Sequence, residues 1–282
     1  MRKNQKYDEL LFSSNIIKLF GYLRKFVSVM KGKICLILIL VFEVLLLLAG
    51  CAKKPSDTLE AKTYDIMTIE ALFSRHGTDE IYLEESGEYV PFLIIDDDYN
   101  GNILLLRQDV LETPMKYNEY QSAYEGSSID TYLNTVYLTS LSDTNLMICD
   151  TDIVVTAAES IGTSGKATSV IERKVFLLSM TELGYNDSNG ATHEGVPLEY
   201  FQNVDNRIAT LNGRPTSWWT RSAETYHNTA VYGVGPDGVL GSGNASDENG
   251  IRPAFCVPKE SVVTLSTDIV QGESVFVLDA CI

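Results

Sequence analysis

Turn-forming residues interrupt the apolar pattern of this chain about every ten positions after residue 63. Clusters of Gly, Asn, Asp and Ser separate short runs that alternate between apolar and polar residues or are apolar throughout. Short runs with such boundaries are typical of β-strands. The pattern therefore predicts many short strands and a few short helices, in a length that fits one domain.

Three of these runs predict an antiparallel meander, at residues 80–83, 89–95 and 102–107. Asn100-Gly101 lies between the second and third runs and is a strong hairpin signal. Pro91 cannot donate a hydrogen bond to a neighbouring strand, so we expect the second strand to begin at or just after it.

One helix is expected after residue 126. Ser127 or Ser128 can cap its first turn, because a serine hydroxyl accepts a hydrogen bond from a free backbone N–H group there. The spacing of the apolar residues that follow places them on one face. These residues are Ile129, Tyr132, Leu133 and Val136.

Further elements are predicted nearer the C-terminus. Residues 175–179 indicate a buried strand, followed by a short helix over 180–183 that ends at Gly184. Pro236-Asp237-Gly238 predicts a turn between two strands, since Pro fixes φ and Gly tolerates the reversal. The last two expected strands are residues 262–265 and 275–278.

An apolar run at 34–50 ends in Leu48-Ala49-Gly50-Cys51, and basic residues precede it. Small residues directly before a cysteine are the pattern of a bacterial lipoprotein signal. We therefore expect residues 1–50 to be a signal peptide and Cys51 to be lipidated, so that the protein is anchored to the outer face of the cell membrane. Residues 51–63 then form a tether, and residues 64–282 form a single extracytoplasmic domain.

A retained transmembrane helix is the alternative for residues 34–50, since seventeen residues at about 1.5 Å each nearly span a hydrocarbon core of roughly 30 Å. Glu43 lies inside this run. An ionised group there costs about 3 kcal/mol on insertion, which favours a cleaved signal. Met30 begins a complete short signal by itself, so translation from Met30 rather than Met1 is a second alternative.

Removal of the leader makes the chain strongly acidic. Eight of the 22 basic residues and three of the 38 acidic residues lie in residues 1–51, which leaves 14 basic and 35 acidic residues and a formal charge of about −21. Such a surface repels nucleic acid and anionic lipid head groups over roughly 8 Å, so no nucleic-acid partner is expected. Cations, cationic peptides and neutral glycans remain compatible with it. An acidic surface that serves solubility alone is the simpler interpretation.

The cysteines leave two arrangements open. Beyond Cys51, the mature part has Cys149, Cys256 and Cys281. One pair can form a disulfide in an oxidising exterior, or all three can be buried thiols. The chain has no C-x-x-C motif after the leader and its three histidines are far apart in sequence, so no zinc site is expected.

Three sequence blocks carry a family resemblance: SWWTRS at 217–222, AVYGVGPDGV at 230–239 and GIRPAF at 250–255. Tyr117-Asn118, the predicted helix through Asn134 and the apolar run at 174–179 also match. Together they resemble the domain-of-unknown-function family 6273, found in exported bacterial proteins, over about residues 90–256. This chain differs in having Ala223-Glu224 where the family usually has Pro-Gly, and it continues for about 25 residues past the usual end.

The blocks are also similar to the C-terminal half of C-type-lectin-like folds, including the formylglycine-generating enzymes. The resemblance implies an α+β fold, with short helices packed on twisted antiparallel hairpins and with long loops. The paired cysteines and the G-N-V-W-E-W segment of those enzymes do not occur in this chain. Their oxidase activity is therefore not implied.

The Trp and Arg residues of these blocks have two open interpretations. Trp218 and Trp219 are adjacent, so in a strand they face opposite sides. Arg221 and Arg252 need carboxylates or carbonyls for their donors if they are buried. In the structural interpretation all four form the core, with Arg partners among Asp205, Asp237 and Glu182.

In the second interpretation the same residues bind a ligand, because an exposed Trp beside an Arg suits stacking on a sugar or pairing with a carboxylate. By analogy with lectin-like folds, the loop at 241–247 tends to carry ligand contacts. The hypothetical binding set is therefore Trp218, Trp219, Arg221, Asn244, Asp247 and Arg252.

No cofactor is expected, and calcium is the one ion worth weighing. Residues 96–101 (DDDYNG) match the first half of an EF-hand loop, but Arg107 stands at position twelve, where Glu is required. A hairpin tip is the simpler interpretation. The polar loop at 186–190, with His193 and Glu194, is a weaker candidate for a divalent cation.

The sequence has no G-x-S-x-G, H-E-x-x-H or phosphate-binding loop, which lowers the expectation of an enzyme. We therefore expect a membrane-anchored binding module for a glycan, peptide or envelope component. An exported enzyme that uses unidentified carboxylates, and a structural envelope lipoprotein, are the alternatives.

Overall fold

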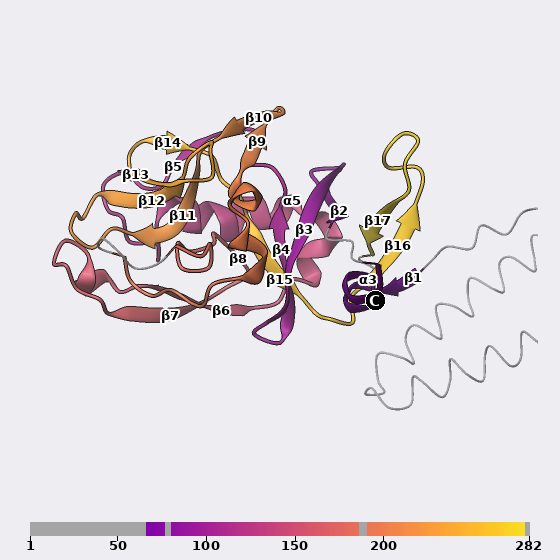
Figure 1. Ribbon diagram of the computed structural model, residues 1–282, viewed down its shortest axis with the longest axis horizontal. Coiled ribbons are helices and arrows are strands. Elements are labelled where there is room, and N and C mark those ends of the chain that lie inside the picture. The colour runs from indigo at the N-terminus through magenta and orange to yellow at the C-terminus, as the bar shows by residue number, and fades with distance from the viewer. Residues whose placement is uncertain (1–65, 77–79, 186–190, 280–282) are drawn as a thin grey trace, which may run out of the picture. The chain divides into compact units, whose positions relative to one another are not determined.

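Short strands dominate the computed structural model of the protein, which describes residues 66–76, 80–185 and 191–279 (Figure 1). The expected signal peptide at 1–50, the lipidated Cys51, the tether at 51–63 and Cys281 lie outside these residues. In the part that is described, no helix is both long enough and apolar enough to cross a membrane.

The sequence prediction of many short strands and few short helices is confirmed, and the fold is a mostly β form of α+β. The strands are β1 (Ile66–Thr68), β2 (Glu80–Glu85), β3 (Glu88–Tyr99), β4 (Asn102–Arg107), β5 (Met115–Lys116), β6 (Thr151–Thr156), β7 (Thr168–Arg173), β8 (Val175–Phe176), β9 (Ala209–Leu211), β10 (Arg214–Thr216), β11 (Trp218–Ala223), β12 (Ala230–Val234), β13 (Leu240–Asn244), β14 (Glu248–Asn249), β15 (Ala254–Val257), β16 (Val262–Ser266) and β17 (Val275–Leu278).

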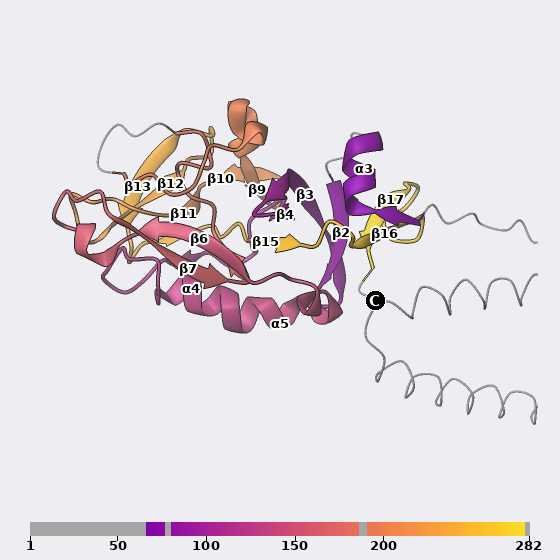
Figure 2. The same ribbon diagram turned by 90° about the horizontal axis from the view of Figure 1, so that it is seen from below.

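The helical elements are few and short. The α-helices are α3 (Ile69–His76), α4 (Ser128–Tyr132) and α5 (Leu138–Ser140), with a π-helical turn η1 (Leu133–Tyr137) between the last two. The 3-10 turns are η2 (Ser142–Leu146), η3 (Ala158–Ser160), η4 (Glu199–Gln202) and η5 (Val204–Arg207). In Figure 2 the segment from α4 to α5 runs along the lower side of the strands.

One mixed sheet of eight strands has the order β1-β16-β17-β2-β3-β4-β15-β8. Its pairs are antiparallel except β17 with β2, which is parallel. The two strands expected at 262–265 and 275–278 are β16 and β17, so that prediction is confirmed. A separate three-stranded sheet, β11-β12-β13, carries two of the signature blocks.

The centre of the large sheet is buried on both faces. Ile103 to Leu106 of β4 and all four residues of β15 are 0% exposed. A strand that is covered on both faces reads as a continuous apolar run, as β4 does. The core therefore lies on either side of β4 and β15.

The predicted meander is confirmed as β2, β3 and β4, but its second strand begins earlier than expected. β3 starts at Glu88, and Pro91 lies inside it opposite Tyr82. The C=O group of Pro91 accepts a hydrogen bond from Gln108 at 3.1 Å. The Pro nitrogen therefore faces the side where the β4 ladder has already ended at Phe92 and Arg107, so no ladder hydrogen bond is lost there.

The predicted helix is confirmed, with Ser127 as its cap: the Ser127 hydroxyl accepts a hydrogen bond from the N–H group of Asp130 at 3.1 Å. Its buried face differs from the expected one. Val136 is 58% exposed, whereas Tyr137 is 1% exposed. The π-helical turn η1 has more residues per turn than an α-helix and so places Tyr137, rather than Val136, in line with the buried Ile129 and Leu133.

Asn134 joins this helix to the edge strand β8. Its Oδ1 accepts hydrogen bonds from the N–H groups of Lys174 (3.2 Å) and Val175 (3.1 Å), and its Nδ2 donates to the C=O group of Val175 (2.9 Å). The side chain thus replaces a neighbouring strand and covers the edge of the sheet.

The prediction for 175–184 is correct only in part. β8 is limited to Val175–Phe176, and Leu177 and Leu178 continue as buried, irregular backbone. The expected helix over 180–183 is wrong. Hydrogen-bonded turns replace it, with Gly184 at φ +78 as their end. The Ser179 and Glu182 side chains cap the first backbone N–H groups reciprocally, but Gly184 in the left-handed conformation ends the segment after about one turn.

Two predicted turns are confirmed. Asn100 and Gly101 have φ of +51 and +84 at the tip of the β3–β4 hairpin, where Asn and Gly are favoured. Gly238 has φ +76 in the turn between β12 and β13. Neither β1 nor α3 was predicted from the sequence, although Ile69 and Leu72 of α3 are 0% exposed.

Candidate functional site

The three signature blocks meet around β11, whose six residues are all buried. Antiparallel pairing joins Trp218 to Val234 and Trp219 to Gly233 of β12, and the register shifts before Ala223. A parallel bridge joins Trp218 to Gly250 at the start of the third block. β11 is therefore the element that positions both the core residues and the pocket described below.

Both tryptophans are buried, because protein covers both faces of β11. Trp218 is 0% exposed, and its Nε1 donates to the C=O group of Arg207 at 3.0 Å. Trp219 is 2% exposed, and its Nε1 donates to the C=O group of Met115 at 3.1 Å. A buried indole N–H needs such a partner.

Arg221 forms a buried ion pair with Glu182, and both side chains are 0% exposed. The pair is bidentate, with Nη1 2.7 Å from Oε2 and Nη2 2.7 Å from Oε1. Nε donates to the C=O group of Val154 at 2.9 Å and Nη1 to that of Leu177 at 2.8 Å. The guanidinium therefore links β11 to residues near β6 and β8, as a buried Arg must do to satisfy its donors.

Of the three carboxylates considered as Arg partners, Glu182 is the one that the structure uses. Its Oε1 accepts a further hydrogen bond from the Tyr99 hydroxyl at 2.6 Å, and its Oε2 accepts one from the N–H group of Ser179 at 2.9 Å. Burial alone would lower the pKa of Arg221, but Glu182 and Tyr99 raise it above its usual value. Burial and Glu182 also raise the pKa of the Tyr99 phenol.

A second carboxylate, Glu194, is equally buried in the same place but has no ion pair among the described residues. Its Oε1 accepts hydrogen bonds from the N–H group of Thr156 at 2.5 Å and from its hydroxyl at 2.6 Å, and its Oε2 accepts one from the Ser222 hydroxyl. Burial raises the pKa of Glu194, although Arg221 and these hydrogen bonds partly offset that effect. We call Arg221, Glu182, Glu194 and Tyr99 the Arg221 centre.

Arg252 has a different environment. It is 1% exposed, and its Nε donates to the C=O group of Arg107 at 3.0 Å. Its guanidinium carbon lies 5.4 Å from the centroid of the Trp218 ring, a cation–π contact. Burial lowers the pKa of Arg252 to about 10. Trp218, Arg221 and Arg252 therefore present no surface that a ligand can touch in this conformation.

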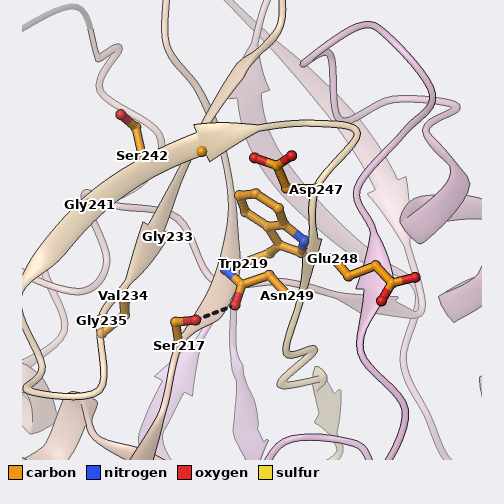
Figure 3. Close-up of a pocket in the computed structure, with 11 residues that line it drawn as sticks. Ser217, Trp219, Gly233, Val234, Gly235, Gly241, Ser242, Asp247, Glu248 and Asn249 are labelled. Atoms are coloured by element: carbon orange, nitrogen blue, oxygen red, sulfur yellow. Dashed lines mark hydrogen bonds between the residues drawn. The ribbon is translucent and has the colours of Figure 1, made fainter.

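An open pocket of about 250 Å³ lies beside Trp219 (Figure 3). We call it the Trp219 pocket. Four segments line it: Ser217 with Trp219, residues 233–235 of the β12 end, residues 241–243 of β13, and residues 247–249. Each of these segments belongs to a signature block or to the loop that joins two of them.

Glycines keep this pocket open. A methyl group at Gly243 would lie 3.1 Å from Cη2 of Trp219, and one at Gly233 would lie 2.8 Å from the C=O group of Trp218. Gly241 faces open space, with no atom within 4 Å of the position of a methyl group. A glycine leaves room for close approach of a ligand to the backbone, which a side chain would block.

The polar groups around the pocket are mostly acceptors. The Ser217 hydroxyl donates to Oδ1 of Asn249 at 2.6 Å, and this pair lies below the indole in Figure 3. Asp247 and Glu248 are exposed carboxylates on the rim. No Lys or Arg is among the described lining residues. The pocket therefore accepts hydrogen bonds and attracts positive or neutral groups.

The structure brings together two residues of the hypothetical binding set, Trp219 and Asp247. Asn244 is exposed and adjacent, since its N–H group donates to Oδ2 of Asp247 at 3.1 Å, but it does not line the pocket. Sequence reasoning did not single out four polar lining residues, which lie within the first signature block or between the second and third. They are Ser217, Ser242, Glu248 and Asn249.

The calcium candidates have no metal geometry in the described residues. The DDDYNG segment forms the β3–β4 hairpin end, which confirms the simpler interpretation. No group of three or more His, Cys, Asp or Glu in the described part is placed to hold a metal ion. Residues 186–190 lie outside that part; of the other two members of the loop candidate, His193 is exposed and Glu194 is buried.

Cys149 and Cys256 are free thiols in the structure. They are neighbours, since the N–H group of Cys149 donates to the C=O group of Cys256 at 2.9 Å. Burial raises the pKa of the Cys256 thiol to about 12, so that it stays protonated and unreactive near neutral pH.

The comparisons with known proteins agree with the signature residues. The family model described as "Domain of unknown function (DUF6273)" matches residues 100–259, from the β3–β4 hairpin tip to just past β15. No curated protein and no solved structure matches the chain. The matched range covers more than half of the chain. It contains the whole Trp219 pocket and every residue of the Arg221 centre except Tyr99. The chain therefore belongs to the DUF6273 family.

Proposed function

We propose that this protein is a lipid-anchored, extracytoplasmic binding module, and that the Trp219 pocket takes a neutral, hydroxyl-rich ligand such as a sugar unit of an envelope glycan. The observation that carries the proposal is the pocket itself: a glycine-lined hollow against an indole, with hydroxyl, amide and carboxylate groups around it.

The chemistry of the lining favours a sugar over an anionic ligand. Sugar hydroxyls donate hydrogen bonds, and the Asp247 and Glu248 carboxylates can accept them. An anion would meet two carboxylates and no cationic side chain of the lining. At about 250 Å³, the pocket is smaller than most drug-sized sites and suits a single small unit.

Trp219 is the floor of this site rather than a stacking platform, because only 2% of it is exposed. Its indole still borders the pocket, so a bound ligand changes the polarity around it. Trp219 is therefore a built-in reporter of occupancy.

The alternative of an exported enzyme has less support. Glu182 and Glu194 are the strongest candidates for paired carboxylates, but both are 0% exposed and engaged with Arg221, Thr156 or Ser222. Acid–base catalysis requires hydrogen-bond reach to a substrate, which these positions do not give.

Two further parts of the proposal rest on the sequence. The small-residue run before Cys51 supports cleavage and lipidation at that residue, and the basic residues before it support an extracytoplasmic domain. The order of the signature blocks, with a helix beside strands and long loops, supports a remote C-type-lectin-like kinship. An experimental structure whose strand order departs from that fold would remove the kinship and leave the pocket unaffected.

The pocket is tested by tryptophan fluorescence of the full chain in a nonionic detergent, titrated with neutral oligosaccharides of envelope type. We expect a saturable change in emission with at least one of them. Ser242→Tyr places a large side chain at the pocket mouth and should abolish the response. Ser246→Tyr is the matched control, because Ser246 is exposed on the same connection and does not line the pocket.

Two results would contradict the proposed site. If no saccharide changes the emission of the unmodified chain, the pocket does not bind this class of ligand. If Ser242→Tyr responds as strongly as Ser246→Tyr, the ligand binds elsewhere. The anchor is tested separately, by labelling cells with a palmitate analogue: incorporation should disappear in Cys51→Ser, and retained labelling would exclude Cys51 as the lipidated residue.

A further inference from the structure

A second and larger pocket, of about 490 Å³, lies between β3 and the 3-10 turns η4 and η5. We call it the Tyr200 pocket. Apolar and aromatic side chains form part of its lining: Phe73 of α3, Ile95 of β3 and Tyr200 of η4. Its volume lies within the range of small-molecule sites, roughly 300–1,000 Å³.

Carboxylates stand on two sides of this pocket. Asp96 and Asp97 come from β3, and Glu199 comes from η4. Neighbouring Asp98 is neutralised by Lys259, with Nζ 2.6 Å from Oδ1. In contrast, Asp97 and Glu199 have no ion pair within the described residues, so the pocket carries uncompensated negative charge.

The arrangement does not suit a single metal ion. A calcium ion needs several oxygen ligands within about 2.6 Å, which requires clustered carboxylates. The acidic groups of the described residues form no such cluster. Carboxylates beside apolar and aromatic side chains instead suit an organic cation, whose charged end and apolar body are several ångströms apart.

We propose that the Tyr200 pocket binds an organic ammonium ion carried on a short apolar chain, such as the lysine side chain of a cationic peptide. The ammonium group pairs with Asp97 and Glu199, and its methylene chain packs on Phe73 and Tyr200. Aromatic faces add a favourable cation–π contribution.

Two independent features agree with a cationic ligand. The chain has 38 acidic against 22 basic residues, so its field draws cations toward such a cleft and repels anions. Asp96 is half-buried. Burial raises its pKa, and the neighbouring carboxylates of Asp97 and Asp98 raise it further. An ammonium ion would relieve this repulsion.

The site combines the family domain with a segment outside it. Phe73, Ile95, Asp96 and Asp97 precede the matched range of 100–259, whereas Glu199 and Tyr200 lie inside it. The Tyr200 pocket therefore depends on an addition that the family match does not include, and its lining shares no residue with that of the Trp219 pocket.

The test uses the full chain in detergent and isothermal titration with Nα-acetyl-lysine N-methylamide, a lysine side chain without other charge. We expect saturable binding that weakens as salt is raised, because the pairs are exposed. Asp97→Asn and Glu199→Gln should each raise Kd at least fivefold. Glu172→Gln removes the same charge at an exposed position of β7 that lines neither pocket, and it should leave Kd within twofold.

Each other outcome overturns the proposal. Equal binding of the neutral Nε-acetylated probe would mean that charge is not recognised. Equal weakening by Glu172→Gln would mean diffuse attraction to an acidic surface. Displacement of the probe by calcium at equimolar concentration would make the site a metal site. Because the saccharide response of Trp219 is measured separately, failure here leaves the proposed glycan site untouched.

Discussion

Trp219 and Arg221 are two residues apart on β11, yet their surroundings are of opposite kinds. Arg221 lies in the buried Arg221 centre, where its N–H groups donate to a carboxylate and to carbonyl groups. Trp219 borders an open pocket whose walls are glycines and whose rim is polar. One short strand of the family signature thus serves both architecture and a candidate site.

The difference shows that an unusual residue in a sequence can have a structural role rather than a ligand-binding one. A charged residue in an apolar strand is readily predicted to contact a ligand. Arg221 instead holds β11 against residues near β6 and β8. The glycines of β12 and β13 would not be chosen as ligand contacts from the sequence, although they leave the space that a ligand needs. The comparison is therefore best tested by substitutions that remove interactions within the Arg221 centre or fill the Trp219 pocket.

Glu182→Gln should have the largest effect, because it leaves the buried Arg221 guanidinium without its counter-charge. Breaking such a pair typically costs about 3–5 kcal/mol of unfolding free energy, which lowers Tm by roughly 6–20 °C in a domain of this size. Thermal unfolding followed by near-ultraviolet circular dichroism measures it.

Glu248→Gln is the matched control for this change, since Glu248 is exposed and its loss should alter stability by about 0.5 kcal/mol or less. If the two variants melt together, Arg221 does not depend on Glu182 and the distinction between the two regions fails.

Tyr99→Phe should have the next largest effect, since it removes one hydrogen bond to the ionised Glu182. Hydrogen bonds to charged groups contribute about 1.5–3 kcal/mol. The pKa of Tyr99 is raised by burial, so its stabilising contribution is complete below the unfolded pKa near 10 and is lost as pH rises further, by about 1.4 kcal/mol per unit.

The gap in stability between Tyr99→Phe and the unmodified chain should therefore narrow above pH 10, because Phe has no proton to lose. Chemical denaturation at pH 8 and pH 10.5 measures the gap. A gap that widens with pH would show that the phenol is not held neutral in the folded protein.

The fold was predictable where local chemistry decides it. Asn100-Gly101, Gly238 and the Ser127 cap each satisfy one backbone requirement, and each was placed correctly. The π-helical turn at 133–137 and the turns at 180–184 were not predicted, because tertiary partners decide them. Glu182 is the clearest case: its side chain accepts a hydrogen bond from the N–H group of Ser179 in its own turn while it pairs with Arg221, which lies 39 positions away.

The candidate site was predictable only in outline. The signature blocks indicated the correct strand and hairpin, and Trp219 and Asp247 do border the pocket. Trp218 is buried with Trp219 because protein covers both faces of β11, and alternation along the strand does not reveal that. Ser217 and Asn249 are 32 positions apart, so only the bridge between Trp218 and Gly250 brings them together.

Gly243→Ala should partly fill the Trp219 pocket at a cost of about 1 kcal/mol, since its new methyl group would lie 3.1 Å from Cη2 of Trp219. The indole must shift, so we expect altered tryptophan emission and weaker saccharide binding. Gly241→Ala is the matched control on the same strand, because its methyl group meets open space. Equal responses from the two variants would show that Gly243 does not shape the pocket.

Glu194→Gln should have the smallest effect at pH 7, within about 1 kcal/mol, although Glu194 is as deeply buried as Glu182. Burial raises the pKa of Glu194, so the folded protein holds the Glu194 proton more tightly than the unfolded chain does. The stability that it contributes is therefore present below the unfolded pKa near 4.5 and is lost as pH rises through the folded pKa. A glutamine has no proton to lose, and its amide can still bond the Thr156 and Ser222 groups.

The stability of Glu194→Gln relative to the unmodified chain should consequently improve between pH 4 and pH 7. Denaturation at both pH values measures it, with Glu182→Gln in parallel. If Glu194→Gln instead loses stability with rising pH, or loses as much as Glu182→Gln at pH 7, then Glu194 is held ionised as a second partner of Arg221. The Arg221 centre would in that case contain three charged groups, Arg221, Glu182 and Glu194, rather than one ion pair and a neutral neighbour.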